Sequence, residues 1–251
     1  MSPGPARLAR AALAALADLL WPPVCAVCPR ALPLDTAGAG WLARFCPACL
    51  DTVELLPAAI CPLCGRPFYN SAGRLCGDCL ADPPPFLSAR AAAVYRGAVA
   101  RSISRLKYHG DMTQVRVLAD LAAAIPETPA WDVIVPLPLS PRRLAARGFN
   151  QALALARAVF PGRLMEPRLL ARPVEAELPQ AVLNRKERQR AIRGSFRVPA
   201  PGLVREARVL LFDDVITTGA TAAEAARTLL AAGAREVHLA AVARTVLSFW
   251  R

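Results

Sequence analysis

The chain has 251 residues, of which 55% are hydrophobic and 20% are charged. This balance is typical of a globular protein and excludes a disordered one, and the length accommodates one large core with one small accessory module. The formal net charge of +12 comes almost wholly from arginine, because lysine occurs only at Lys107 and Lys186. Arginine binds phosphate well, so the charge is compatible with a phosphate-rich ligand or a nucleic acid, and equally with a bias in coding composition.

The N-terminal segment has the pattern of an amphipathic helix. Leu8, Leu13, Leu16 and Leu20 fall on one helical face, and Asp18 interrupts the apolar run. No stretch approaches the roughly 20 apolar residues of a membrane span. We therefore expect a short helix that packs on the protein rather than a signal peptide, with contact to a membrane surface as the alternative. This interpretation predicts a cytoplasmic protein without stable membrane insertion.

Eight cysteines follow as four C-x-x-C pairs. Both thiolates of such a pair can bind one ion, and two pairs complete a tetrahedral shell without an open position. Disulfides would imply a secreted protein, and redox C-x-x-C motifs come singly beside a βαβ pattern. We predict two structural zinc ions, and crossed pairing of the knuckles remains an alternative to pairing by chain order. By chain order the ligands are Cys25, Cys28, Cys46 and Cys49 for the first ion and Cys61, Cys64, Cys76 and Cys79 for the second.

Three consecutive prolines, Pro83 to Pro85, resemble a linker between two modules. We place the boundary there, with an N-terminal helix and double zinc ribbon in residues 1–85 and a second domain in residues 86–251. In that domain, predicted strands alternate with predicted helices, which indicates an α/β fold with a mostly parallel sheet covered on both faces. The strands are expected at 91–97, 131–139, 207–216 and 236–244, and the helices at 97–107, 112–124, 145–159 and 221–232.

The stretch "VLLFDDVITTGAT" ends the third predicted strand. Arg208 to Phe212 form the buried strand, Asp213 and Asp214 leave it together, and a helix begins near Ala222. A Thr/Gly turn at a helix N-terminus binds phosphate through its backbone N–H groups. The two acids repel a phosphate and should accept hydrogen bonds from hydroxyl groups of the same ligand. The stretch therefore predicts a sugar phosphate site.

These residues resemble the 5-phosphoribosyl 1-pyrophosphate (PRPP) motif of type I phosphoribosyltransferases. Further segments at 106–111, 135–156 and 178–196, together with the cysteine-rich front, resemble the ComF family, also called GntX-like or competence protein F. The resemblance implies a type I phosphoribosyltransferase fold with an N-terminal double zinc ribbon. It also implies binding of Mg-PRPP and a role in DNA uptake or nucleotide metabolism.

The resemblance assigns roles one position at a time. Asp213 and Asp214 match the acids that contact the ribose hydroxyls. The residues that match the 5′-phosphate loop are Thr217, Thr218, Gly219, Ala220 and Thr221. The pyrophosphate loop corresponds to Pro136, Leu137 and Pro138, and the cations that follow it and could close over pyrophosphate are Arg142, Arg143 and Arg147.

The implied reaction is displacement of pyrophosphate from ribose C1 by an unknown nitrogenous acceptor or water, with Mg²⁺ and arginines neutralising the leaving group. In 6-oxopurine enzymes an acid occupies the position of Thr217, so such a purine is not the expected acceptor. The family usually has His, Thr and Asn where this chain has Ser140, Glu177 and Ala191, and these departures leave transferase activity open.

The alternative function is a non-catalytic, PRPP-responsive zinc-ribbon protein that binds single-stranded DNA during DNA uptake. Its sequence support is the arginine-rich segment 184–197, which could also be a solvated helix. Neither histidine is expected to be catalytic: His238 lies in an apolar strand and should be packed or at an edge, and His109 could lie near the site. The sequence leaves the oligomeric state open.

Overall fold

The computed structural model describes residues 23–32, 40–68, 74–126, 129–173 and 192–246. The amphipathic helix expected before residue 22 lies outside these ranges, as do Glu177, Ala191 and positions 184–191 of the arginine-rich segment. Across the described ranges, no helix has both the length and the apolar character required to cross a membrane.

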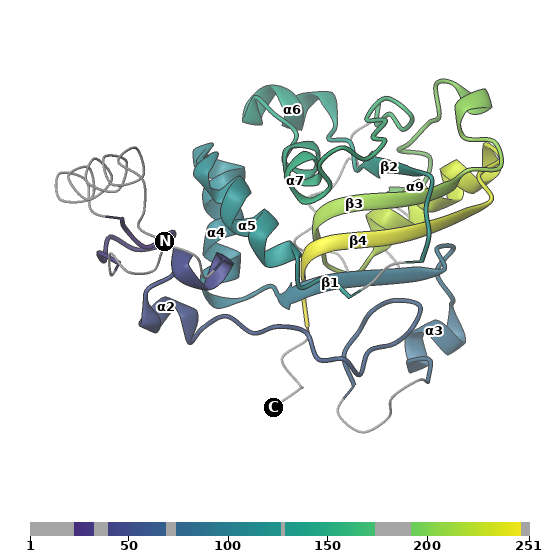
Figure 1. Ribbon diagram of the computed structural model, residues 1–251. Helices are drawn as coiled ribbons and strands as arrows, with labels where there is room; N and C mark the ends of the chain where they lie inside the picture. The colour runs from purple at the N-terminus through teal and green to yellow at the C-terminus, as the bar shows by residue number, and fades with distance from the viewer. Residues whose placement is uncertain (1–22, 33–39, 69–73, 127–128, 174–191, 247–251) are drawn as a thin grey trace, which may run out of the picture.

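Four parallel strands form the sheet (Figure 1). Their order across the sheet is β1-β4-β3-β2, so β3 and β4 are central. Every one of the nine residues of β4 but the first is buried, as expected for a strand covered on both faces. The predicted parallel α/β architecture is thereby confirmed. The strands are β1 (Ser88–Val94), β2 (Val133–Pro136), β3 (Arg208–Ile216) and β4 (Glu236–Arg244).

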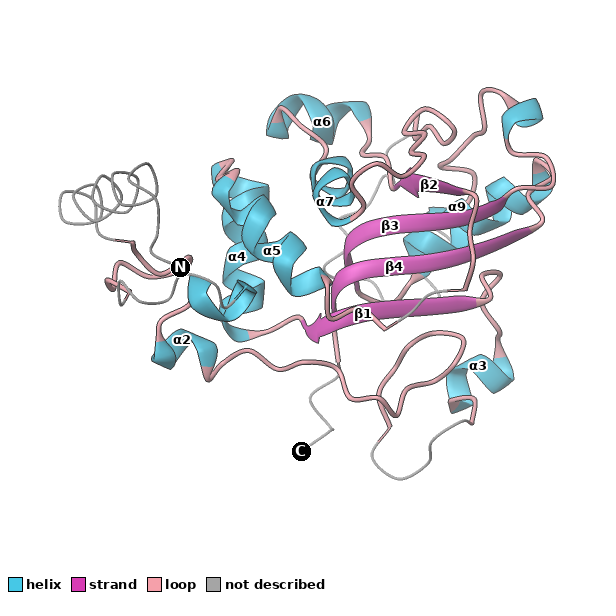
Figure 2. Cartoon of the chain, viewed as in Figure 1, coloured by secondary structure: helices cyan, strands magenta, loops and turns pink. Residues whose placement is uncertain are grey.

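Helices cover the two faces of this sheet (Figure 2). Alternation along β3 sends Leu210 and Phe212 into one buried cluster and Val209 and Leu211 into the other. The first cluster is closed by α4 (Gly97–His109), α5 (Thr113–Ala122) and α7 (Gln151–Val159), and the second by α9 (Ala220–Ala231). The short helix α6 (Pro141–Arg147) follows β2, and the short 3-10 helix η2 (Pro201–Leu203) precedes β3.

The cysteine-rich front lies along the outer edge of β1. Leu56 N–H donates to the Ala92 carbonyl at 3.0 Å and Val94 N–H donates to the Glu54 carbonyl at 2.8 Å. This short antiparallel contact occupies backbone groups that an edge strand would otherwise leave unpaired. The short helices of the front are η1 (Gly40–Arg44), α2 (Pro47–Leu50) and α3 (Gly77–Ala81).

The single helix predicted at 145–159 is wrong. Gly148, with φ of +80°, ends α6 in a left-handed conformation, and Asn150 starts α7. The Asn150 side chain accepts hydrogen bonds from the backbone N–H groups of Ala152 and Leu153, as an N-cap does. The helical signal in this region therefore belongs to two helices separated by a left-handed glycine and a cap.

The third strand agrees with the range expected for it, 207–216, but the place of its acids differs from prediction. Strand β3 does not leave the sheet after Phe212; it continues through Asp213 and Asp214 to Ile216, because β4 pairs with it over its whole length. Helix α9 begins at Ala220 rather than near Ala222. The acids therefore lie within the strand, and only three residues separate β3 from α9. The strand predicted at 236–244 is confirmed as β4, whereas two others are shifted: 91–97 is observed as Ser88–Val94, and 131–139 as Val133–Pro136.

Gly97 is required where the front meets the first helix of the second domain. A Cβ atom built on Gly97 would lie 2.3 Å from the Thr52 carbonyl oxygen, and its φ is +53°. Gly110 has a similar φ of +63° but open space around it. We expect Gly110→Ala to cost about 1 to 2 kcal/mol for the left-handed conformation, and Gly97→Ala to cost about 1 to 3 kcal/mol more for overpacking. Chemical denaturation of both variants measures the difference, and equal losses would contradict the close approach.

Candidate active site and metal centres

A cavity of about 610 Å³ opens at the carboxyl ends of the strands. In open parallel sheets, ligands bind at this edge. The cavity brings together residues from distant parts of the chain, from the end of β1 to the start of α9. Its lining residues are Tyr95, Lys107, Tyr108, Leu137, Pro138, Leu139, Arg143, Ala146, Arg147, Gln151, Arg172, Asp213, Asp214, Val215, Thr217 and Thr221.

The pairing of β2 with β3 stops at Phe212, next to the residues that line the cavity. Leu137 N–H donates to the Phe212 carbonyl at 2.8 Å, and the next bond of a parallel ladder would run from Asp214 N–H to the Leu137 carbonyl. Instead, the Leu137 carbonyl accepts from Asn150 Nδ2 at 3.0 Å, and Asp214 N–H donates to Asp213 Oδ1 at 2.8 Å. Two side chains therefore end the ladder and separate β2 from the acid pair.

The two acids have different surroundings because they are adjacent in a strand. Asp214 is 2% exposed and forms an ion pair with Lys107 of α4. Asp213 is half-buried and borders a narrow cavity of about 30 Å³ with Thr217, Gly219 and Thr221. Each acid also lines the large cavity. The pair therefore presents one carboxylate beside a cation and one beside the Thr/Gly turn.

Burial and the neighbouring charge of Asp214 raise the pKa of the Asp213 carboxyl well above its usual range. Burial disfavours the charged form of Lys107, but the carboxylates of Asp214 and Asp213 outweigh it and raise the pKa of its ammonium group. Two acids and one ammonium group thus share a site from which much of the water is excluded. A cation or several hydroxyl donors beside the pair would favour the ionised form of Asp213.

The Thr/Gly turn has the geometry of an anion site. Gly219, with φ of +79°, is the N-cap of α9, and its carbonyl accepts from Ala223 N–H at 2.8 Å. Thr218 Oγ1 accepts from Ala220 N–H at 3.4 Å. The N–H groups of the first helical turn and the positive end of the helix dipole favour an anion beside this turn. Ala220 and Thr221 belong to the first helical turn.

The opposite side of the cavity is cationic. Arg147 donates to Gln151 Oε1 at 2.5 Å, and its guanidinium carbon lies 5.7 Å from the centre of the Tyr108 ring. Arg143 also lines the cavity from α6, whereas Arg142 of the same helix does not. Arg172 is 6% exposed and lies over the Phe196 ring at 5.3 Å.

The structure brings eight of the predicted site residues to this cavity and places the rest nearby. Pro136 ends β2 just before it, and Thr218, Gly219 and Ala220 border a smaller cavity on the other side of the turn. The eight are Leu137, Pro138, Arg143, Arg147, Asp213, Asp214, Thr217 and Thr221.

Several cavity residues were not predicted. Lys107 lies in the segment "LKYHGD". The sequence feature that could have indicated its role is that lysine is rare in this chain, where arginine supplies almost all of the positive charge. Tyr95, Gln151 and Arg172 carried no local signal, because only the tertiary fold brings them to the cavity.

Ser140 and the two histidines, which the sequence analysis discussed, do not line the large cavity. Ser140 is fully buried at the position before α6. His109 is exposed at the end of α4, and His238 is buried in β4, where its Nδ1 lies 2.9 Å from Ser88 Oγ. His238 is packed, as the sequence indicated.

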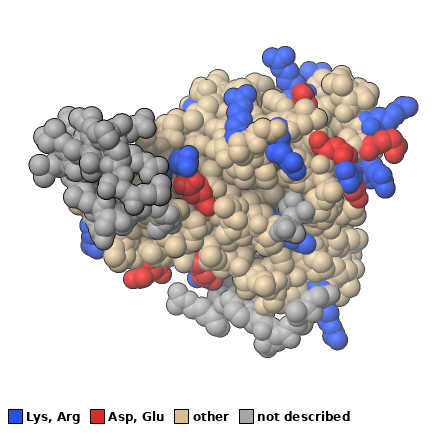
Figure 3. Space-filling view, in the orientation of Figure 1, with Lys and Arg blue, Asp and Glu red and all other residues tan. Residues whose placement is uncertain are grey.

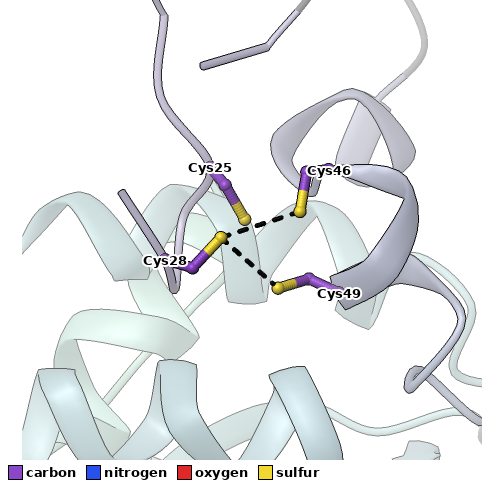
Figure 4. A group of neighbouring side chains, drawn as sticks. All are labelled: Cys25, Cys28, Cys46 and Cys49. Atoms are coloured by element: carbon purple, nitrogen blue, oxygen red, sulfur yellow. Dashed lines mark hydrogen bonds between the residues drawn. The ribbon is translucent and has the colours of Figure 1, made fainter. Parts of the chain in front are cut away.

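Two cysteine clusters form the predicted zinc sites. Within each cluster the four sulfur atoms lie within 4.8 Å of one another, and the grouping follows chain order, so crossed pairing is wrong. Figure 4 shows the first cluster, in which Cys28 Sγ lies 3.6 Å from Cys46 Sγ and 3.7 Å from Cys49 Sγ. Zn–S bonds of about 2.3 Å in a tetrahedron place neighbouring sulfurs about 3.8 Å apart, so the thiolates fit zinc. The clusters are Cys25, Cys28, Cys46 and Cys49, and Cys61, Cys64, Cys76 and Cys79.

Each cluster is attached to a different part of the second domain. At the first, Arg101 of α4 lies 3.6 Å from Cys49 Sγ, and Gln114 of α5 donates to the Ala26 carbonyl at 2.9 Å. At the second, Arg244 at the end of β4 donates to the Cys64 carbonyl at 2.5 Å, and Arg90 of β1 donates to the Pro62 carbonyl at 3.0 Å. Both ribbons therefore pack on the sheet domain through specific polar contacts.

Known proteins resemble this chain over its length and in its parts. The family model of the double zinc ribbon domain matches residues 16–80. The DNA utilization protein YhgH of Salmonella typhi is 31% identical over 231 residues, which cover 85% of this chain and 100% of that protein. The competence protein ComFC of Bacillus subtilis is 27% identical over 227 residues, which cover 84% of this chain and 90% of that protein.

Among solved structures, the glutamine PRPP amidotransferase of Bacillus subtilis, complexed with ADP and GMP, aligns with a TM-score of 0.30 and 23% identity. The alignment covers 57% of this chain and 27% of that protein, so this chain spans about a quarter of its length.

Metal analysis tests the two cysteine clusters. We expect two zinc ions per chain, with Cys25→Ser and Cys61→Ser each releasing one, because a three-thiolate shell with one hydroxyl holds zinc less tightly. Loss of zinc should also lower the thermal stability of the front. One zinc or none in the unaltered protein, with the thiols oxidised, would contradict this assignment.

Replacing Asp213 and replacing Asp214 should have opposite effects on the stability of the protein. Because its pKa is raised, folded Asp213 keeps a proton that the unfolded chain loses above about pH 3.9, so stability falls as pH rises from there through the raised pKa. Asp213→Asn removes this loss and should raise the melting temperature at neutral pH. Asp214→Asn leaves the Lys107 ammonium without its ion-pair partner and should cost about 3 kcal/mol. Thermal melts from pH 4 to pH 8 measure both, and a destabilised Asp213→Asn would refute the charge argument.

Proposed function

This chain belongs to the ComF family, since it is 30% identical to the competence protein ComFC of Streptococcus pneumoniae over 80% of its own length and 87% of that protein. We propose that its large cavity binds PRPP with Mg²⁺. We further propose that the protein is an enzyme that transfers the phosphoribosyl group to an acceptor and releases pyrophosphate. The main support for the proposal is that the Asp213–Asp214 pair and the Thr/Gly turn before α9 both border the same cavity.

The cavity supplies a matching group for each part of PRPP. The turn around Gly219 suits the 5′-phosphate, and the carboxylates of Asp213 and Asp214 suit the ribose hydroxyls and their associated cation. Arg143 and Arg147 stand on the other side, next to the loop at Leu137 and Pro138, where pyrophosphate would lie. Charged groups of both signs in one cavity fit a ligand that has both hydroxyl groups and phosphates.

The proposed reaction breaks the bond between ribose C1 and the pyrophosphate oxygen and forms a bond from C1 to the acceptor. Pyrophosphate leaves with the electron pair, and the acceptor loses one proton. Positive charge develops on the ribose ring, and the carboxylates of Asp213 and Asp214 would stabilise it. Bound Mg²⁺ supplies neutralisation of the pyrophosphate charge. Among the described residues that line the cavity, these two acids are the only carboxylates, so an acceptor that needs no separate carboxylate base fits best.

A second candidate is a PRPP-responsive protein that binds single-stranded DNA and has no transferase activity. The names of the relatives, a DNA utilization protein and a competence protein, favour this class. On the face shown in Figure 3, Lys and Arg side chains lie in separate places rather than in one stripe. Of the arginine-rich segment, Arg193 and Arg197 are in the described part of the chain, and both are exposed. A DNA titration at several salt concentrations tests this candidate, because backbone contacts weaken steeply with salt.

Binding and turnover of PRPP test the enzyme proposal. We expect the full chain with Mg²⁺ to bind PRPP and to release pyrophosphate in the presence of one member of a panel of nitrogenous acceptors. Asp213→Asn and Asp214→Asn should each weaken PRPP binding about tenfold or more, since a charge-assisted hydrogen bond contributes about 1.5 to 3 kcal/mol.

The matched control is Asp51→Asn, which changes an exposed acid at the end of α2 and should leave PRPP affinity unaltered. Because Asp213→Asn should be stable, weaker binding in that variant does not reflect unfolding. Unchanged affinity in both acid variants would refute the site. Binding without pyrophosphate release for any acceptor or water would favour the second candidate.

A further inference from the structure

Arg244 is a buried cation that none of the proposed chemistry uses. It is the last residue of β4 and is 5% exposed. One terminal nitrogen donates to the Cys64 carbonyl at 2.5 Å, and Nε has no hydrogen-bond partner among the described residues. A buried charge is costly unless nearby groups compensate it. The position of Arg244 therefore depends on the second cysteine cluster.

The second cluster provides that compensation when it holds zinc. Four thiolates and one Zn²⁺ carry a net charge of about −2. Cys64 is a ligand of this cluster, and its carbonyl is the acceptor that orients the Arg244 guanidinium. The zinc-bound knuckle thus supplies both an opposite charge and a fixed hydrogen-bond acceptor.

Arg244 also borders the Thr/Gly turn. In the sheet it is paired with Ile216, and the following residue, Thr245, donates its N–H to the Ile216 carbonyl at 2.9 Å. Ile216 precedes the turn directly. A narrow cavity of about 40 Å³ separates the turn from the second ribbon; its walls include Cys64, Cys79 and Arg244 on one side and Thr218, Gly219 and Ala220 on the other.

We propose that Arg244 is a positioning residue that couples the second zinc cluster to the turn that takes the 5′-phosphate. Zinc at this cluster fixes the Cys64 carbonyl, the carbonyl holds Arg244, and Arg244 holds the end of β4 and the turn beside it. This inference rests on the proposed function, since it concerns the phosphate subsite of the same cavity. The two zinc sites are then unequal: the second affects ligand affinity, and the first does not.

The first cluster offers a matched comparison. Arg101 lies 3.6 Å from Cys49 Sγ, so it also touches a zinc ligand. It belongs to α4, however, and does not line any of the cavities that border the turn. Arg101→Met therefore removes an arginine from a zinc cluster without touching the phosphate subsite.

Calorimetric titration of the full, zinc-loaded chain with ribose 5-phosphate tests the coupling. Arg244→Met should weaken the binding of ribose 5-phosphate roughly three- to thirtyfold, which is the range in which residues between two coupled sites alter affinity. Pyrophosphate should bind with unchanged affinity, because its expected contacts lie across the cavity. Arg101→Met should change neither affinity. Arg244→Lys keeps the charge with fewer donors and should show a smaller loss, about threefold.

The outcomes separate this inference from the function on which it rests. If the unaltered chain binds neither ribose 5-phosphate nor PRPP, the proposed function is wrong and the coupling falls with it. If it binds both and neither Arg244 variant alters ribose 5-phosphate affinity, the coupling alone is wrong. If Arg244→Met weakened pyrophosphate binding as much as ribose 5-phosphate binding, the variant would have lost structure generally, and the proposal would be overturned. An equal loss of ribose 5-phosphate affinity in Arg101→Met would overturn it as well. If Arg244→Met does not fold, the Lys variant decides.

Discussion

The interruption of hydrogen bonding between β2 and β3 after Phe212 is the constraint on which the cavity depends. A complete ladder would hold Leu137 and Asp214 together and would close the sheet at the point where the cavity now opens. At this point Asn150 donates to the Leu137 carbonyl, and the same side chain caps α7. One asparagine therefore holds the last carbonyl beside the interrupted pairing and starts the next helix.

The same interruption places the acids where their charges are least favourable. Asp214 is compensated by Lys107, and Asp213 has a raised pKa because partial burial and the charge of Asp214 disfavour its ionised form. Such a pair is retained in a folded protein only if the surrounding structure is stable enough to hold it. A ligand that brings a cation and hydroxyl groups would relieve the repulsion between the two acids. The repulsion lowers the stability of the free protein, and its relief would strengthen ligand binding. Stability and ligand affinity are thus opposed at Asp213.

How much could be predicted from the sequence depended on whether the signal was local. The zinc ligands are local, since each C-x-x-C pair specifies its own knuckle, and chain order gave the observed grouping. Gly148 and Asn150 were also local signals for the end of one helix and the start of the next, but the apolar periodicity of 145–159 concealed them. The length of β3 depends on pairing with β4, and the presence of Lys107 and Arg172 in the cavity depends on the tertiary fold. No spacing rule reports such contacts.

The zinc ribbons contact strands and a helix whose ends lie near the cavity. These contacts bear on both candidate functions. Residues 54–56 pair with the edge of β1, Thr52 Oγ1 accepts from Ala98 N–H at 2.9 Å, and Cys64 accepts from Arg244. A partner that bound the second ribbon would therefore act on Arg244 and on the end of β4. Under the proposed coupling, a sugar phosphate in the cavity would change the affinity of the second ribbon for that partner by the same factor, by the reciprocity of linked equilibria. Under the proposed function and coupling, an enzyme and a ligand-responsive binding protein would use the same cavity, and they would differ in whether an acceptor reaches ribose C1.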